Sequence, residues 1–252
     1  MKRLLPTSLR HTRLIATIII GLAATLLPQQ ATAQTVIDLH TGKVSGKTRQ
    51  DYNVKTREDW QLHEDSVAYA DCVTRAFNFL YEDSLQTAQD LFERALKLRP
   101  DAPENAVVRH NIGRIFMARR QWRDAISLFT RVLDEIPRYA ELREDRATCF
   151  IQLSQYEKAL KDYEYLLMTH PDDEHYRLFH AMMLCYTGAK YDAIDELDAL
   201  IATDDSNASY FLTRAGVYTD LGNKGYARRD LDRAVALGIP KEDIQDLYEQ
   251  LK

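Results

Sequence analysis

Glycine and proline are scarce in this sequence, with nine and seven among 252 residues. Both residues mark turns, so their scarcity disfavours a β architecture with many turns and suits long helices. Apolar residues make up 45% of the chain and charged residues 28%, as in ordinary globular proteins. The composition therefore predicts a folded, helix-rich protein with a substantial core.

Motifs that carry catalysis are also missing. The sequence contains no Gly-rich phosphate loop, no G-x-S-x-G and no H-E-x-x-H. The densest set of potential metal ligands is the run from His170 to His175, with His180 beyond it. A metal ion needs three or four converging ligands, whereas His175 and His180 point in different directions on a helix, and Asp172 and Asp173 suit a helix N-cap. We therefore expect no enzyme, no cofactor and no metal, and keep an enzymatic, metal-binding or small-ligand role as the third hypothesis.

Cysteine is rare, and its number is odd. With only Cys72, Cys149 and Cys185, one disulfide at most can form, and the sequence does not determine which two would pair. All three lie in apolar helical stretches, so we expect buried thiols that act as small apolar side chains.

The first 33 residues have the order of a secretory signal peptide. Basic residues come first, an uncharged apolar stretch from Leu14 to Leu27 follows, and Ala31-Thr32-Ala33 supplies a cleavage site. A membrane anchor is the alternative, but a helix of this apolar length covers only ~21 Å, and a span needs about 20 residues. We expect cleavage after Ala33 and no membrane span in the mature chain. The protein is then exported; we expect a bacterial periplasm as its destination, with release from the cell as the alternative.

Cleavage makes the protein more acidic. Removal of the four basic residues lowers the formal charge from −5 to −9. An acidic protein repels phosphate backbones, so a nucleic acid is not the expected partner. Residues 34–57, rich in turn formers and dispersed charge, are expected to be a flexible segment.

A repeat of about 34 residues organises the rest of the chain. Pro100, Pro137 and Pro171 each close a helical stretch, at spacings of 37 and 34 residues. Proline ends a helix because it donates no hydrogen bond and disfavours helix in the residue before it. In this register a small residue recurs in each first helix: Ala76, Gly113, Ala147, Ala181 and Ala215. In each second helix an alanine recurs, followed four residues later by a large apolar residue: Ala88 and Phe92, Ala125 and Phe129, Ala159 and Tyr163, Ala193 and Leu197, Ala227 and Leu231.

This pattern resembles the tetratricopeptide repeat, a 34-residue helix–turn–helix unit with small, aromatic, alanine and proline landmarks in the same order. The resemblance covers residues 69 to 239, although the usual early Trp is missing and the last two units lack proline in register. It implies an all-α, right-handed α-solenoid of about five helical hairpins. The array would span residues 58–240, with units near 69–102, 106–139, 140–173, 174–207 and 208–240. An amphipathic capping helix is expected at 241–252, where Ile244, Leu247, Tyr248 and Leu251 share one face.

In this family the first helix of each unit lines a concave groove. The resemblance therefore implies a partner-binding face, which comprises Val73, Phe77, His110, Arg114, Met117, Glu141, Glu144, Thr148, His175, Leu178, Met182 and Leu212. Some of these side chains could instead pack between units. The groove would be apolar at its start, charged in its middle and apolar again, which suits a peptide with apolar anchors and a charged centre. A carboxylate clamp of the kind found in chaperone adaptors is disfavoured, because Val73 and Phe77 replace its Lys and Asn, and Glu141 is acidic.

These patterns predict a non-catalytic scaffold or adaptor of the cell envelope that binds a peptide or protein segment in its groove. The alternative is a structural subunit of an envelope assembly that docks by its convex face or its capping helix. The sequence does not determine the partner or the oligomeric state.

Overall fold

The structure is a computed structural model that describes residues 57–251. The signal peptide predicted for residues 1–33 and the segment 34–56 lie outside the described residues. In the described part every regular element is a helix, and none of these helices combines the length and the apolar character needed to cross a bilayer. The prediction of an all-α protein is confirmed.

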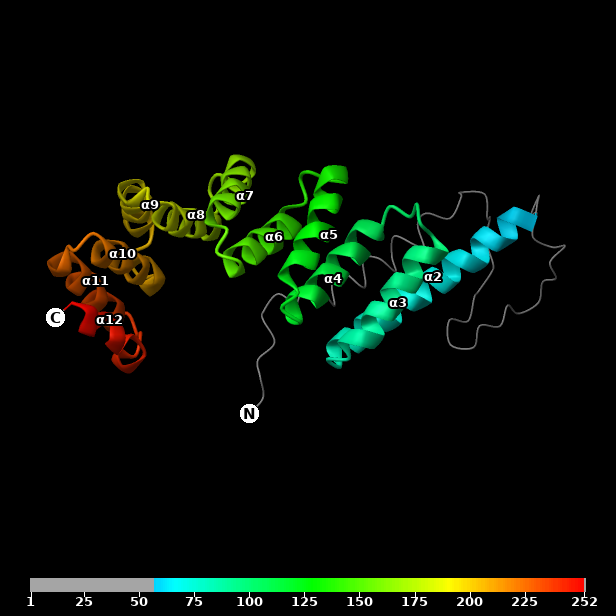
Figure 1. Ribbon diagram of the computed structural model, residues 1–252, viewed down its shortest axis with the longest axis horizontal. Helices are drawn as coiled ribbons and strands as arrows, with labels where there is room; N and C mark the ends of the chain where they lie inside the picture. The colour runs from blue at the N-terminus through cyan, green and yellow to red at the C-terminus, as the bar shows by residue number, and fades with distance from the viewer. Residues whose placement is uncertain (1–56, 252) are drawn as a thin grey trace. The chain divides into compact units, whose positions relative to one another are not determined.

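The helices follow one another along the chain in pairs joined by short turns, and an amphipathic cap follows the last pair (Figure 1). The pairs are α2 (Arg57–Tyr81) and α3 (Leu85–Leu98), α4 (Asn105–Ala118) and α5 (Trp122–Glu135), α6 (Ala140–Gln152) and α7 (Tyr156–Thr169), α8 (Glu174–Thr187) and α9 (Lys190–Thr203), and α10 (Ala208–Asp220) and α11 (Lys224–Ala236). The cap is a 3₁₀ helix η2 (Lys241–Ile244) that leads into α12 (Gln245–Gln250).

The chain forms two compact units, divided between Ile115 and Phe116 within α4. In the first unit α2 packs against α3, with the Phe77 ring edge-on to the Phe92 ring at 5.3 Å. Helix α2 begins at Arg57, well before the repeat boundary expected near residue 69. Hydrogen bonds one turn apart, such as Gln61 to Asp65 at 2.9 Å, support this extension of the helix.

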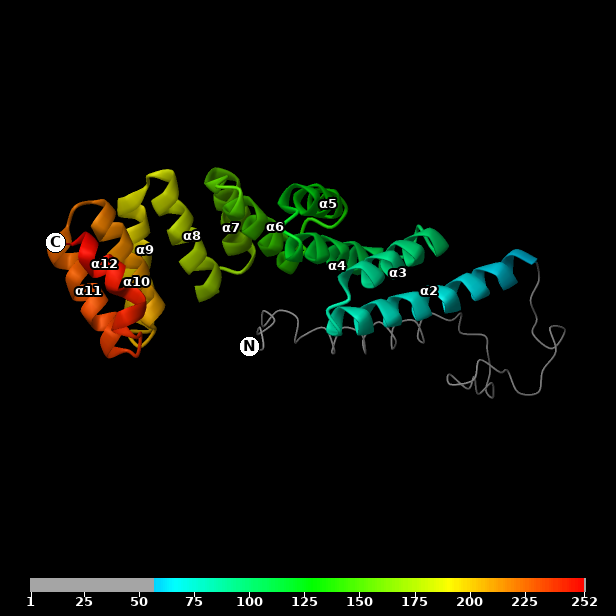
Figure 2. The same ribbon diagram turned by 60° about the horizontal axis from the view of Figure 1, so that its bottom comes forward.

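In the second unit each helix from α5 to α11 packs against its neighbours in sequence. The cap lies beside α11 in both views (Figures 1 and 2), and its Ile244, Tyr248 and Leu251 are buried in one cluster with Leu231. This burial matches the apolar face that the sequence predicts for the capping helix.

The repeating small and large residues form the core, as their spacing predicts. The alanine and the large residue that recur in the second helices are all at most 1% exposed. Alanine lets two helices approach closely, and the large side chain one turn away fills the space beside the contact.

The turns inside the hairpins share a left-handed residue. Arg120, Ser154, Gly188 and Gly222 stand 34 residues apart, and their φ angles are 60°, 55°, 97° and 73°. Glycine adopts this conformation without a steric penalty, whereas arginine and serine do not.

Candidate interaction surface

Three rows of side chains run along the first helices of successive hairpins, α6, α8 and α10. Residues 34 apart in sequence hold equivalent positions in these hairpins, and residues three to four apart share one face of a helix. All nine side-chain positions are exposed or half-buried, so they form one accessible face, which we call the three-row face. The rows are Glu141, His175 and Ser209; Glu144, Leu178 and Leu212; and Thr148, Met182 and Gly216.

A polar contact joins two of the rows. His175 Nε2 on α8 lies 2.8 Å from Glu144 Oε1 on α6, and the imidazole also packs against the Phe179 ring at 4.7 Å. The hydrogen bond to the Glu144 carboxylate raises the pKa of His175, because it stabilises the imidazolium form. This pair places a titratable group on the middle helix of the face.

The apolar members of the face are anchored in the core below it. Leu178 packs on the cluster that contains Leu197, Met182 on the cluster that contains Tyr163, and Leu212 on the cluster that contains Leu231. Each keeps part of its side chain accessible. The face thus presents fixed apolar positions on α8 and α10 beside the carboxylates of α6.

Three of the five groove residues predicted in the first two repeats are buried. Val73, Phe77 and His110 are 3%, 8% and 5% exposed, so they belong to the interior and offer no surface to a partner. Arg114 and Met117 are half-buried. Sequence spacing cannot separate a groove position from a core position on the first helix, because both recur at the same helical period.

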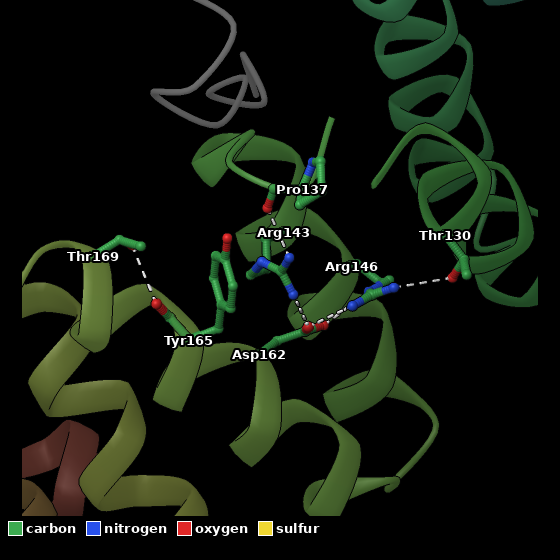
Figure 3. Close-up of polar contacts among 7 residues, drawn as sticks. All are labelled: Thr130, Pro137, Arg143, Arg146, Asp162, Tyr165 and Thr169. Atoms are coloured by element: carbon green, nitrogen blue, oxygen red, sulfur yellow. Dashed lines mark hydrogen bonds and ion pairs between the residues drawn. The ribbon is translucent and has the colours of Figure 1, made fainter. Parts of the chain in front are cut away.

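Ion pairs join neighbouring helices within the second unit. Arg146 of α6 donates Nε to Asp162 of α7 at 2.9 Å and Nη1 to Thr130 of α5 at 3.2 Å (Figure 3). Asp162 is 2% exposed and also accepts from Arg143 Nη1 at 3.1 Å. One carboxylate therefore pairs with two guanidinium groups, and the Arg146 guanidinium connects three helices.

The same position recurs every 34 residues along the chain. Position 146 is followed by His180, Arg214 and Tyr248. His180 Nδ1 lies 2.9 Å from Glu196, Arg214 bonds to Asp230 and Asp198, and the Tyr248 hydroxyl donates to Asp232 at 2.7 Å. Partners stand 16 residues before or after each of these positions, so these contacts fix the register within a hairpin and between adjacent hairpins. We call this series the polar ladder. Sequence reasoning missed it, although the recurrence of acids at Asp162, Glu196 and Asp230 was a signal that could have revealed it.

The histidines that could suggest a metal site do not converge. His170 contacts Thr169, His175 contacts Glu144, and His180 contacts Glu196. Asp173 caps α8 by accepting from the Tyr176 amide at 3.0 Å, which is the role that the sequence predicts for it. Among residues 57–251 no three His, Cys, Asp or Glu side chains are grouped as metal ligands would be.

The three cysteines are free thiols. Cys72 and Cys149 are buried and Cys185 is half-buried. Burial raises the pKa of all three thiols, that of Cys149 to about 12, so each stays protonated and is a poor nucleophile near neutral pH.

Tyrosines collect at the turn end of the hairpins in the second unit. Tyr156 and Tyr186 stack with ring centroids 4.5 Å apart, and Tyr218 stacks on Tyr226 at 5.2 Å. Tyr186, Tyr191 and Tyr226 remain 57%, 72% and 56% exposed. This tyrosine edge is the second accessible aromatic or apolar feature of the unit, and the sequence did not identify which tyrosines are exposed.

Known proteins share this architecture. Residues 116–183 match the family model described as tetratricopeptide repeat. Among solved structures the chain resembles YrrB, a TPR protein with an unusual peptide-binding site, with a TM-score of 0.60 and 19% identity over 73% of this chain and 93% of that chain. It resembles MamA (residues 41 to the end) from Desulfovibrio magneticus RS-1, with a TM-score of 0.62 and 12% identity over 68% and 94%. TTC0263, a thermophilic TPR protein in Thermus thermophilus, aligns with a TM-score of 0.51 and 18% identity over 73% and 98%. No curated protein sequence matches the chain.

The structural likenesses, all below 25% identity, establish a shared fold. The matched segment holds α5 to α7 and most of α8, and helix pairs with the same buried landmarks precede and follow it in the chain. Residues 116–183 therefore match the tetratricopeptide repeat family, and the described helices share the fold of solved tetratricopeptide repeat proteins.

Proposed function

We propose that this protein is a non-catalytic scaffold of the cell envelope that binds a peptide or protein segment on the three-row face. The fold is generally an interaction module, and no catalytic family matches the chain. The observation that carries the proposal is the face itself. Its nine accessible positions recur on the first helices of three successive hairpins, and half-buried apolar side chains lie beside carboxylates.

The chemistry of the face indicates the kind of segment that fits it. Glu141 is exposed on α6, and Glu144 is close to it on the same helix. Leu178, Met182 and Leu212 follow on α8 and α10. A segment that carries a cation followed by apolar side chains would satisfy both parts. YrrB, which shares the fold, is described as having a peptide-binding site, and this supports the use of such an array for peptides.

Export is the second part of the proposal. It is supported by the basic head, the apolar stretch and the Ala31-Thr32-Ala33 site of the sequence. N-terminal sequencing of the protein purified from its own cells tests it directly. A mature chain that begins at Gln34, recovered from the periplasmic fraction or the medium, is the expected result. An intact N-terminus in the cytoplasmic fraction would contradict it.

Site-specific photo-crosslinking in cells tests the face. A photoreactive phenylalanine analogue is placed at Glu141 or at Ser209, both exposed members of the first row, and at Tyr191 as the matched exposed control. We expect one discrete adduct from Glu141 and Ser209, identified by mass spectrometry, and none from Tyr191. Absence of adducts at both row positions would refute binding on this face.

The tyrosine edge favours a second candidate function, a structural subunit of an envelope assembly. Exposed tyrosines are typical of interfaces because one side of the ring is apolar and the hydroxyl stays wet. Adducts from Tyr191 alone, with none from Glu141 or Ser209, would support this alternative.

A further inference from the structure

An arginine in the α6–α7 hairpin stacks on an aromatic ring and donates two hydrogen bonds. The Arg143 guanidinium lies over the Tyr165 ring at 3.7 Å from its centroid and donates to Asp162 at 3.1 Å and to the Pro137 carbonyl at 2.8 Å (Figure 3). The aromatic face, the carboxylate and the carbonyl thus replace part of the water that this buried guanidinium loses, while its Nε is buried without a hydrogen-bond partner.

The next hairpin repeats the arginine without the ring. The residues 34 positions later are Arg177 for Arg143, Ala199 for Tyr165 and Glu196 for Asp162. Arg177 Nη2 donates to the Pro171 carbonyl at 2.7 Å, as Arg143 does to Pro137. Glu196 instead turns both of its oxygens to His180.

A pocket of about 430 Å³ opens at this place. It is a shallow depression open to solvent, not an enclosed cavity. Arg177 lines it together with Ala199, at the position where the previous hairpin has Tyr165. The full lining is Leu167, Pro171, Arg177, Asp195, Glu196 and Ala199.

The α10–α11 hairpin restores the pair with the two residue types exchanged. Phe211 stands at the arginine position and Arg233 at the tyrosine position, 34 residues after Arg177 and Ala199. The Arg233 guanidinium lies 5.7 Å from the Phe211 ring centroid, and its Nη2 donates to the Asp205 carbonyl at 3.1 Å. The hairpins on both sides of α8–α9 therefore join a guanidinium to an aromatic ring at this place.

We propose that the pocket beside Arg177 receives an aromatic side chain from a partner protein, which stacks on the guanidinium as Tyr165 stacks on Arg143. The attraction is between the cation and the negative face of the ring. The carboxylate of Asp195, exposed at the rim, favours a lysine or arginine next to the aromatic residue of the partner. This site is lined by residues of α7, α8 and α9 and uses none of the nine positions of the three-row face, so it goes beyond the proposed function.

The test titrates the protein with N-acetyl-L-tyrosinamide and follows the Arg177 Nε–H and Ala199 methyl signals by NMR. We expect saturable shifts of both signals in the wild type. In Ala199→Tyr the protein's own tyrosine ring occupies the place beside Arg177, so the added ligand should no longer shift the Arg177 signal. The same contact should raise the Tm by about 2–4 °C. Ala202→Tyr, which adds the same side chain at an exposed position outside the pocket, is the matched control and should leave the shift unchanged.

Two further variants keep the test decisive. Arg177→Gln retains a polar side chain without the cation, and it should abolish the shift of the Ala199 methyl even if Ala199→Tyr folds poorly. Tyr165→Ala should create a second saturable site, seen at the Arg143 Nε–H. The absence of a saturable shift at Arg177 in the wild type, or an equal shift in Ala199→Tyr, would overturn the proposal.

Peptide selection then tests the aromatic requirement in a protein segment. A random 12-residue phage library is panned on the wild type and on Ala199→Tyr. Peptides recovered only on the wild type should share one Tyr, Phe or Trp with a neighbouring cation, and the same peptides from both proteins would contradict the assignment. The photo-crosslinks from Glu141 and Ser209 should be unchanged in Ala199→Tyr, so failure of this site and failure of the three-row face are distinguishable.

Discussion

Replacement of Asp162 by alanine is the most informative change to the polar ladder. Asp162 is 2% exposed and accepts hydrogen bonds from the guanidinium groups of Arg143 and Arg146. Without the carboxylate, Arg143, itself 9% exposed, keeps its charge in the interior beside the neutral Pro137 carbonyl and the Tyr165 ring. Alanine therefore leaves an uncompensated buried cation.

The size of the effect follows from that burial. Removing one partner of a buried ion pair costs about 3–5 kcal/mol, since the remaining charge has neither its partner nor water. Asp198 is the matched control, because its side chain is 51% exposed and it contacts Arg214, which keeps its buried partner Asp230. Asp198→Ala should reduce the free energy of unfolding by only about 0–1 kcal/mol.

Urea denaturation followed by circular dichroism measures both variants against the wild type. Slopes of the transitions are compared as well as midpoints, because arrays of repeats can unfold in more than one step. The loss in Asp162→Ala should persist at 1 M salt, since a buried pair is screened much less than an exposed one. If Asp162→Ala loses less than about 1 kcal/mol, as little as the control, the two arginines are solvated after the change and the ladder is not a structural element.

Three further predictions concern single positions. His175 should titrate with a pKa above about 6.5 by NMR. Because Glu144 raises this pKa in the folded state, the pair stabilises the protein fully below about pH 6.5, and this stabilisation is lost as pH rises through the raised pKa. Glu144→Gln should remove this pH dependence of stability, and an unchanged His175 titration in that variant would contradict the pair. Gly188→Ala should lower the free energy of unfolding by about 1 kcal/mol, because φ at this residue is 97° and no neighbouring atom would clash with the added methyl group. Gly216→Ala, in the middle of a helix, should raise the free energy of unfolding by about 0.5–1 kcal/mol. Equal changes in the two variants would argue against the left-handed turn at Gly188. Cys149 should resist a thiol reagent at pH 8 in the native protein and react on unfolding, and immediate labelling would show that burial does not protect it.

Much of the fold was predictable from spacing alone. Ala125, Ala159 and Ala193 stand 34 residues apart and are all fully buried, as the repeat requires. The same holds for the capping helix, where Ile244 and Tyr248 are buried on one face. Helical periodicity predicts these positions because residues three to four apart lie on the same side of a helix. The side that is buried in one repeat is buried in the others.

The candidate site was predictable only in part. The rows on α6, α8 and α10 are accessible where the repeat register places them, as Glu141, Leu178 and Met182 show. Val73 and Phe77 have the same apolar pattern and are buried. The sequence of one helix does not show which of its apolar side chains another helix covers, because that depends on packing between segments distant in sequence.

By itself the sequence determined the helical class, the hairpin register and the identity of the core positions, because these follow from local periodicity and side-chain size. Only the tertiary structure decided the electrostatics. Asp162 meets two arginines from α6, Glu144 meets His175 across two helices, and Arg177 borders a pocket because Ala199 has no ring. The ion pairs among these contacts join residues 16 to 31 positions apart. They depend on how helices are rotated and spaced when they pack, and no single helix contains that information.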